Sequence, residues 1–468
     1  MSIVAIIISI NVLSIMVWGV TGDATIAFLA FFTLLCHYLV VSRSLKETSL
    51  RSSRNILILY SFLLCLISVI SYKQSVIIGG ELTPYLAGSD GEFYFELALA
   101  VSGSDKIDEL RSITGAYFGY QTILSTLLDI FGKNLFVGLL LNNTLVSLTV
   151  LTVVRVTWLL TKDKQNCFYS ALAFILTTKI IYYSNILLKD PFLCFGVALV
   201  MYMVAKIHDR KAMTLPAYLA IGVPALIFGM MRQPMLVIIP FSFLALGRIG
   251  LKIIWLPAII FLTVVGSFTA FIGSFTTHSF AFEQVIDIIF NNQVLSNAAR
   301  DGSNTDGIVG TFSSVYGQLP ILIKMVLILF PAMFQFILPF NFWSTKFLDD
   351  HLIDFFNVQG NVIWYLFIGV FMVYGMLYWK RLPRNLSKRL FLVGVALYLA
   401  NAFVFGGVVP RYSSPYLIMM FPTIGYLMSC LMGKRGDYIH IKRFFERYYY
   451  AVFTVVILFL FLTLSRNA

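Results

Sequence analysis

Apolar stretches of about 20 residues recur along nearly the whole length of this 468-residue chain. An α-helix of that length spans the hydrocarbon core of a bilayer, and so many stretches cannot all be buried inside one water-soluble core. The composition agrees, because 59% of the residues are hydrophobic and 12% are charged, whereas about 25% are charged in ordinary globular chains. We therefore expect an all-α polytopic membrane protein. This excludes soluble enzymes, disordered chains, collagen and small disulfide scaffolds.

About 13 transmembrane helices are predicted from the apolar runs. They cover residues 3–20, 25–41, 55–72, 134–161, 167–184, 186–206, 215–231, 234–247, 253–274, 361–379, 390–409, 413–432 and 448–465. The run 319–340 is also apolar, but a crossing there would reverse the side of the next basic loop. Pro331 and Pro339 favour a re-entrant or interfacial helix instead. The first run lacks a basic region before it, so we expect a retained helix and no cleaved signal.

Positive charges fall on alternate loops and thereby predict the orientation. If residues 42–54 are cytoplasmic, so are the basic loops at 162–164, 206–211, 248–252, 380–389 and 434–447. Cytoplasmic loops are enriched in Lys and Arg, so the N-terminus is predicted inside and residues 73–133 outside. The formal charge of +12 is then mainly an orientation signal that also attracts anionic membrane lipid. No basic and aromatic pattern indicates nucleic acid as a partner.

The spans and loops divide the chain into four regions. Residues 1–54 form an N-terminal pair of spans with a cytoplasmic loop, and 55–274 form a core that contains the long outer loop 73–133. Residues 275–360 form an outer region with re-entrant or interfacial helices, and 361–468 form the C-terminal spans. Long loops are usually functional when they are ordered, and the pattern of 121–131 predicts an amphipathic helix on the membrane surface. Chemistry is therefore expected on the outer side.

The cysteine and histidine residues give no sign of a metal or redox centre. All five cysteines lie in or beside apolar runs, so we expect them to be small core residues. The histidines are scattered, and the nucleotide and zinc motifs GxGxxG, GxxxxGK[ST] and HExxH are absent. The chain also lacks a DxD sequence. No cofactor is predicted, and a divalent metal is left open.

An acidic cluster stands in the first outer loop, where Asp90 and Glu92 begin a helical stretch. A loop carboxylate can act as a general base in transfer to a hydroxyl group. The alternative is structural, because Asp90 can cap the helix with Glu92 in its first turn. Spacing alone leaves both interpretations open.

Lys189 and Asp190 form a second charged group at the outer end of a predicted span. Ionisable residues at membrane depth are expensive and usually functional. The alternative is a mutually neutralising pair at a helix start, with Pro191 in the first turn. Arg232 and Arg411 also fall on the outer side, where Arg can bind a lipid phosphate in a bidentate manner. Their alternative role is to extend toward lipid headgroups without a specific ligand.

Taken in order, these motifs resemble the GT-C superfamily of membrane glycosyltransferases, which use polyprenyl-linked sugar donors. The resemblance covers about residues 73–240 and 390–430. The segments that carry it are Asp90-Gly91-Glu92-Phe93-Tyr94, Tyr117-Phe118-Gly119-Tyr120, Phe131-Gly132-Lys133-Asn134 with Asn142 and Asn143, the turn from Tyr183-Ser184 to Lys189-Asp190, Arg232, and Arg411-Tyr412 with Pro415.

The resemblance implies a GT-C-like fold and transfer of a sugar from a polyprenyl-phosphate donor to a cell-envelope glycan, such as lipopolysaccharide or O-antigen. The site would face the outside of the bacterial inner (plasma) membrane. Asp90 would take the proton of the acceptor hydroxyl, with Glu92 as the competitor for that role. The implied donor-binding residues are Lys189, Asp190, Arg232, Arg411 and Tyr412. The expected acceptor-binding residues are Tyr94, Tyr117, Tyr120 and Arg300, the last at the start of a Gly/Ser/Asn-rich stretch that is otherwise a flexible turn.

Two other functions remain open from the sequence. An O-antigen or capsule repeat-unit polymerase would join oligosaccharides carried on polyprenyl diphosphate at the same face, and its large outer loop would be 276–320. A lipid-linked sugar flippase or transporter would instead place charges along a central pathway between related halves. Neither feature of a transporter is evident in the sequence.

Overall fold

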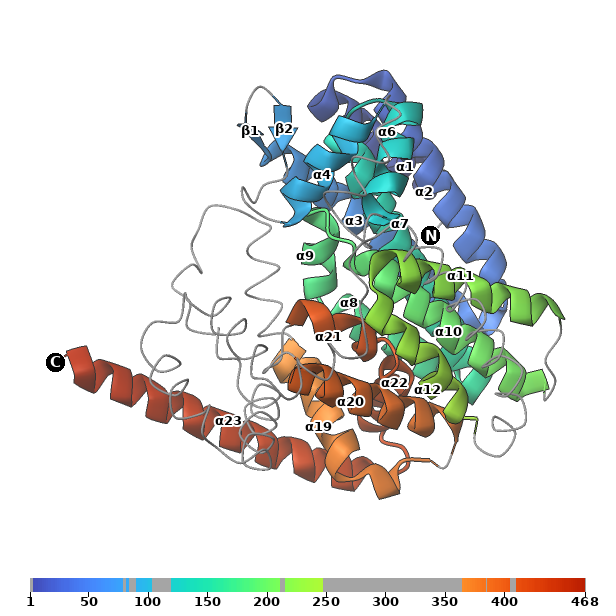
Figure 1. Ribbon diagram of the computed structural model, residues 1–468. Coiled ribbons are helices and arrows are strands. Elements are labelled where there is room, and N and C mark those ends of the chain that lie inside the picture. Colours follow the sequence, from blue (N-terminus) through green and yellow to red (C-terminus); the bar gives the residue numbers. More distant parts are fainter. Residues whose placement is uncertain are drawn as a thin grey trace, which may run out of the picture.

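The computed structural model describes residues 3–78, 81–83, 90–102, 119–210, 215–246, 364–383, 385–404 and 410–467, and this part is almost entirely helical (Figure 1). Its first half contains α1 Ile3–Thr21, α2 Ala24–Ser44, η1 Thr48–Leu50, α3 Arg51–Lys73, α4 Asp90–Val101, α6 Gly119–Phe131, α7 Leu135–Thr161, α8 Lys164–Ile175, α9 Lys179–Asn185 and α10 Asp190–Arg210. Its second half contains α11 Leu215–Met231, η3 Gln233–Val237, α12 Ile238–Leu244, η6 Trp364–Gly369, α19 Val370–Leu377, η7 Trp379–Arg381, α20 Leu386–Val404, α21 Pro410–Leu417, α22 Phe421–Gly433 and α23 Tyr438–Asn467.

The expectation of a purely helical chain misses one small element. Strands β1 Val76–Ile78 and β2 Glu81–Thr83 form an antiparallel pair just after α3, with Val76 opposite Thr83. Three-residue strands of this kind lie within a loop and do not span a membrane, which needs about nine or more residues per strand. The fold is therefore helical with one loop hairpin.

Five helices in the described part are long and apolar enough to cross a membrane, namely α1, α2, α3, α7 and α10. Helices α8 and α9 make a sixth if they count as one span bent by 54°. The chain is thus a membrane protein by the length and composition of its helices. The number 13 remains a prediction, and the expected span 253–274 and the expected re-entrant run 319–340 lie outside the described residues.

Several predicted continuous spans are broken in the structure. The run 413–432 is two helices, α21 and α22, separated by a turn at 418–420. Pro422 lies in the first turn of α22, where its missing N–H costs nothing. The run 186–206 begins only at Asp190, because Leu187 adopts a left-handed backbone conformation with φ of 58°. The short run 234–247 is a 3-10 turn, η3, followed by α12.

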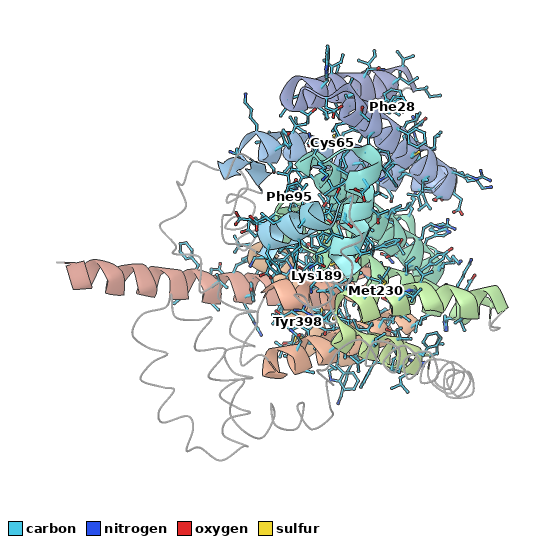
Figure 2. All side chains as sticks on the ribbon, turned by 45° about the horizontal axis from the view of Figure 1, so that its top comes forward. Phe28, Cys65, Phe95, Lys189, Met230 and Tyr398 are labelled. Atoms are coloured by element: carbon cyan, nitrogen blue, oxygen red, sulfur yellow. The ribbon has the colours of Figure 1, made fainter. Side chains whose placement is uncertain are left out.

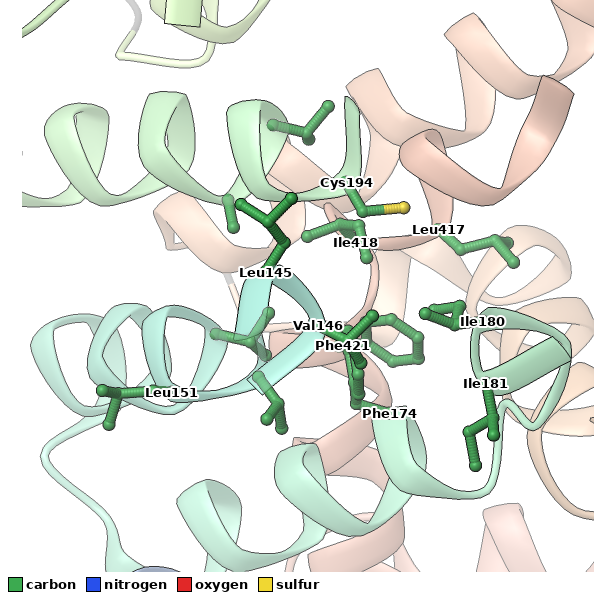
Figure 3. Close-up of a cluster of buried hydrophobic side chains, with 14 of the residues drawn as sticks. Leu145, Val146, Leu151, Phe174, Ile180, Ile181, Cys194, Leu417, Ile418 and Phe421 are labelled. Atoms are coloured by element: carbon green, nitrogen blue, oxygen red, sulfur yellow. The ribbon is translucent and has the colours of Figure 1, made fainter. Parts of the chain in front are cut away.

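Helix α7 is the centre of the bundle. Its sequence is apolar on all sides, as is typical of a buried helix, and it packs against α2, α3, α8, α9, α10 and α22. Figure 3 shows Leu145 and Val146 of α7 beside Phe174 of α8 and Phe421 of α22. The rings of Phe174 and Phe421 have centroids 5.4 Å apart. This core joins the N-terminal half of the chain to the C-terminal helices.

Polar side chains bind α3, α7 and α9 together inside this apolar core. Ser68 Oγ of α3 donates to Asn185 Oδ1 of α9 at 2.8 Å. Asn143 Nδ2 of α7 donates to Leu64 O at 3.1 Å and also to Ser68 Oγ. Such interhelical hydrogen bonds stabilise membrane helices because a polar group facing hydrocarbon has no alternative partner. They fix α9 against the bundle.

The basic loops gather at one end of the bundle, as the sequence predicts. Arg155 Nη1 donates to Ser44 O at 2.8 Å, which brings the end of α2 beside α7. Further contacts join the other loops at this end: Lys162 Nζ to Asp209 Oδ1 at 3.4 Å, Arg435 Nη1 to Asp163 Oδ2 at 3.4 Å, and Arg389 Nη1 to Ala245 O at 3.2 Å. We call this the basic end, and the opposite end the site end.

Candidate functional site

Five helices from different parts of the chain meet at the site end. Helix α4 packs against α6, α6 packs against α11, and the region of α10 packs against α21. Figure 2 labels Phe95 on α4, Lys189 before α10 and Met230 near the end of α11. A Cβ atom added to Gly119, the first residue of α6, would lie 2.5 Å from Met230 Cβ. Glycine is therefore required for α6 and α11 to approach this closely.

The acidic pair occupies the first turn of α4, as expected. Asp90 is the first residue of the helix and is exposed, whereas Glu92 is buried with a relative exposure of 9%. The helix dipole stabilises carboxylates at this position. The two acids thus differ in access: Asp90 can be reached from outside the bundle, and Glu92 is held within the packing.

Lys189 is joined to α4 through an aromatic contact. Its Nζ lies over the Tyr94 ring, 5.6 Å from the centroid. Tyr94 in turn meets Tyr120 of α6 edge to face, with centroids 5.6 Å apart, and Tyr120 meets Phe192 of α10 at 5.8 Å. A cation over an aromatic face is attracted by the ring quadrupole. The structure thus places Tyr94, an expected acceptor-binding residue, directly beside Lys189, an expected donor-binding residue, and Tyr120 next to Tyr94.

Tyr120 also carries a hydrogen bond into α7. It is fully buried, and its hydroxyl donates to Asn142 Oδ1 at 3.3 Å. Burial raises the pKa of Tyr120 well above its ordinary value, although the hydrogen bond to Asn142 opposes the rise. Tyr120 therefore stays a neutral phenol and a hydrogen-bond donor at physiological pH.

Asn142 holds the turn that presents Lys189 and Asp190. Its Nδ2 donates to Ser184 O at 3.2 Å and to Leu188 O at 3.0 Å. These carbonyls flank the left-handed Leu187 in the connection between α9 and α10. Because Asn142 also accepts from Tyr120, one buried amide links α6, α7 and the charged turn.

Asp190 begins α10 and is only 2% exposed, whereas Lys189 is half-buried. Phe192, two residues after Asp190, packs edge to face against Tyr120 with ring centroids 5.8 Å apart, which brings the start of α10 beside the aromatic group that Lys189 adjoins. Pro191 lies in the first turn of α10, as the sequence predicts. The two charged residues therefore belong to one cluster with Tyr94 and Tyr120.

Arg232 lies at the site end, where α11 approaches α6. It follows α11 directly, with its N–H donating to Phe228 O at 2.7 Å, and its charge acts on the Tyr416 hydroxyl of α21. Arg411 and Tyr412 are also on α21, in its first turn. Their side chains, and the whole of Tyr117 and Arg300, lie outside what the structure describes. The predictions for these four residues stay untested.

Sequence reasoning quoted Asn142 among the motif residues but gave it no role. Its role as the hub of the charged turn depends on contacts with residues about 20 and 45 positions away. A signal existed in the sequence, since an amide in the middle of an apolar span is costly unless it has partners. Its partners could not be deduced from the sequence. They lie on α6 and in the turn before α10, and only tertiary packing brings these segments to α7.

No group of three or more His, Cys, Asp or Glu side chains that could hold a metal ion occurs among the residues that the structure describes. Cys65, Cys167, Cys194 and Cys430 are buried, Cys36 is half-buried, and all five are free thiols. The expectation that they are small core residues agrees with this burial.

Comparisons with models of protein families, with curated proteins and with solved structures find no match for this chain.

Proposed function

We propose that this protein is a membrane glycosyltransferase of the GT-C type. It transfers a sugar from a polyprenyl-phosphate carrier to a cell-envelope glycan on the outer face of the membrane. The observation that carries the proposal is that an accessible acid, Asp90, lies at the same end of the bundle as Lys189, Asp190 and Arg232, opposite the basic loops. The positive-inside rule assigns that end to the outside.

The proposed reaction is a displacement at the anomeric carbon. Asp90 takes the proton of the acceptor hydroxyl, and the acceptor oxygen forms a bond to the anomeric carbon. The bond between that carbon and the carrier phosphate oxygen breaks, and the electron pair leaves with the phosphate. Lys189 and Arg232 stabilise the negative charge that develops on the phosphate as it departs.

The surrounding structure suits a lipid-linked donor. The Tyr94 ring lies beneath the cation of Lys189, Tyr120 packs edge to face against Tyr94, and the buried Asn142 keeps the turn before α10 in place. A charged group held in this way needs little reorganisation when charge develops in the transition state. The apolar helices beside the turn would accept a polyprenyl chain.

Mass spectrometry of cell-envelope glycan from strains with and without the gene tests the function. The proposal predicts that one type of sugar residue is lost while the chain-length distribution is kept. A loss of chain length with every sugar present would instead indicate a repeat-unit polymerase. An unchanged glycan would contradict both enzymes.

A further inference from the structure

A second cluster of charged and polar groups lies at the basic end, on the opposite side of the bundle from the candidate site. Lys380 Nζ and Lys388 Nζ both lie over the ring of Trp379, at 5.9 Å and 4.9 Å from its centroid. The Trp379 side chain is 44% exposed. Tryptophan is enriched at the membrane–water interface because its ring is apolar and its N–H is polar. Trp379 therefore has the properties of an interfacial residue. Two cations lie beside its ring.

The two lysines differ from other basic residues at this end in their partners. Arg381 lies 3.8 Å from Asp437, and Lys162 and Arg435 also pair with carboxylates. Within the described part of the chain, Lys380 and Lys388 make aromatic contacts but pair with no carboxylate. Two like charges that share one ring repel each other. An anion between them would relieve this repulsion.

A cleft adjoins Lys388 and supplies hydrogen-bonding groups. It has room for about one water molecule and is lined by Thr161 of α7, by Leu382, Pro383 and Asn385, by Ser387 and Lys388 of α20, and by Thr423 and Tyr426 of α22. Most of its lining side chains carry a hydroxyl, amide or ammonium group. Asn385 Oδ1 accepts from the Lys388 N–H at 3.2 Å, which fixes the start of α20 at the edge of the cleft.

The helices around the cleft are held by polar contacts. Ser387 Oγ and Thr423 Oγ1 are 2.8 Å apart, and Thr423 Oγ1 donates to Ser387 O at 3.0 Å. Both residues are buried, with exposures of 4% and 2%. These hydrogen bonds hold together the helices that form the walls of the cleft. The cationic side chain at its edge is that of Lys388.

We propose that the lysine pair beside this cleft binds the phosphate group of an anionic phospholipid in the leaflet next to the basic loops. The phosphate would lie between Lys380 and Lys388, with its headgroup at the mouth of the cleft and its acyl chains along the apolar helices beside Trp379. A phospholipid fits better than a free anion because the site joins charge to an interfacial aromatic ring. This site is separate from the proposed sugar transfer.

Native mass spectrometry of the purified full chain, with defined lipids added, tests the proposal. The wild-type protein should retain phosphatidylglycerol in preference to phosphatidylcholine. Removing each charge, in Lys380→Gln and in Lys388→Gln, should lower phosphatidylglycerol retention about fivefold, which is the effect of one surface charge. Lys388→Arg should keep binding because it keeps the charge.

Lys442→Gln is the matched control. Lys442 lies at the same end and is exposed like Lys380, but it pairs with Glu446 at 3.8 Å, so this variant should bind like the wild type. Equal retention of both lipids, or equal losses in Lys388→Gln and Lys442→Gln, would overturn the site. Competition by inorganic phosphate as effective as that by the lipid would overturn the assignment to a phospholipid. Thermal unfolding of each variant identifies misfolding, and Lys388→Arg then provides the decisive comparison.

Discussion

At the scale of single residues, Asn142 is the feature on which the candidate site depends most. Three hydrogen bonds converge on one amide that is wholly buried in α7. They connect the aromatic pair of Tyr94 and Tyr120 to the turn that carries Lys189. The short Asn142 side chain, buried inside the bundle, thus holds the turn that places Lys189 at the site end.

Asn142→Ala should destabilise the protein. The substitution leaves the carbonyls of Ser184 and Leu188 without their donor, and an unsatisfied buried polar group costs about 1–3 kcal/mol. Thermal unfolding in detergent measures the effect. Asn11→Ala is the control, because Asn11 is exposed and bonds only to Ile7 O of its own helix, so its loss should change stability by less than about 0.5 kcal/mol. Equal stability of the two variants would contradict the role of Asn142.

Lys189→Gln should reduce sugar transfer about 100-fold, which is the effect expected when one donor to a developing negative charge is removed. Lys189→Arg keeps the charge and should retain much more activity. Lys133→Gln is the control, because Lys133 follows α6 outside the proposed site and its Nζ donates to Ser102 O at 3.4 Å. Transfer from lipid-linked donor in membranes gives the readout. Wild-type transfer by Lys189→Gln would remove Lys189 from the reaction.

At the scale of elements, the close contact of α8 and α22 joins the N-terminal and C-terminal halves. A Cβ atom added to Gly425 of α22 would lie 2.1 Å from Ser170 Oγ, 2.6 Å from Ser170 N and 2.8 Å from Asn166 O of α8. Two of these atoms belong to the backbone and cannot rotate away. Small residues at such positions allow membrane helices to approach closely.

Gly425→Ala should therefore force α8 and α22 apart and cost about 1–3 kcal/mol, which is typical of overpacking. Gly222→Ala in α11 is the matched control, because a Cβ atom there meets nothing within 4 Å. Unfolding temperatures in detergent compare the two variants. An unchanged temperature for Gly425→Ala would show that the two helices pack less tightly than described.

The sequence predicts the positions of most helices but not their breaks. The limits of α1, α7 and α11 follow the apolar runs to within about one residue. The break between α21 and α22 lies inside a continuous apolar run, where hydropathy has no contrast, whereas the break between α8 and α9 lies at the polar Thr177-Thr178-Lys179. The break before α10 depends on the local backbone conformation of Leu187, which no short pattern specifies.

At the scale of the whole molecule, the main finding is the separation of two ends. Basic loops lie at one end, and the expected acids, lysine and arginine of the site lie at the other. The sequence predicts this separation because Lys and Arg are enriched in the loops on the cytoplasmic side of a membrane protein. The contacts within the site could not be predicted, since Tyr120 and Asn142 meet through tertiary packing.

Thiol labelling of intact cells tests the orientation. Thr126→Cys lies on an exposed part of α6 at the site end, and Lys442→Cys lies at the basic end. An impermeant maleimide should label the first in intact cells and the second only after the membrane is opened. The wild-type protein is the control, because its own thiols are buried or half-buried. The reverse pattern would place the candidate site in the cytoplasm.

The central claim is that Asp90 takes the acceptor proton during sugar transfer at the site end. Asp90→Asn keeps the shape of the side chain but removes its basicity, so transfer should fall by about 10² to 10⁴. Glu92→Gln should cost less, because Glu92 is buried in the packing of α4. The most direct measurement is single-turnover transfer by the two variants, together with binding of the lipid-linked donor. We expect normal donor binding with lost transfer in Asp90→Asn. Near-normal transfer in that variant, or a larger loss in Glu92→Gln, would contradict the role of Asp90 as the base.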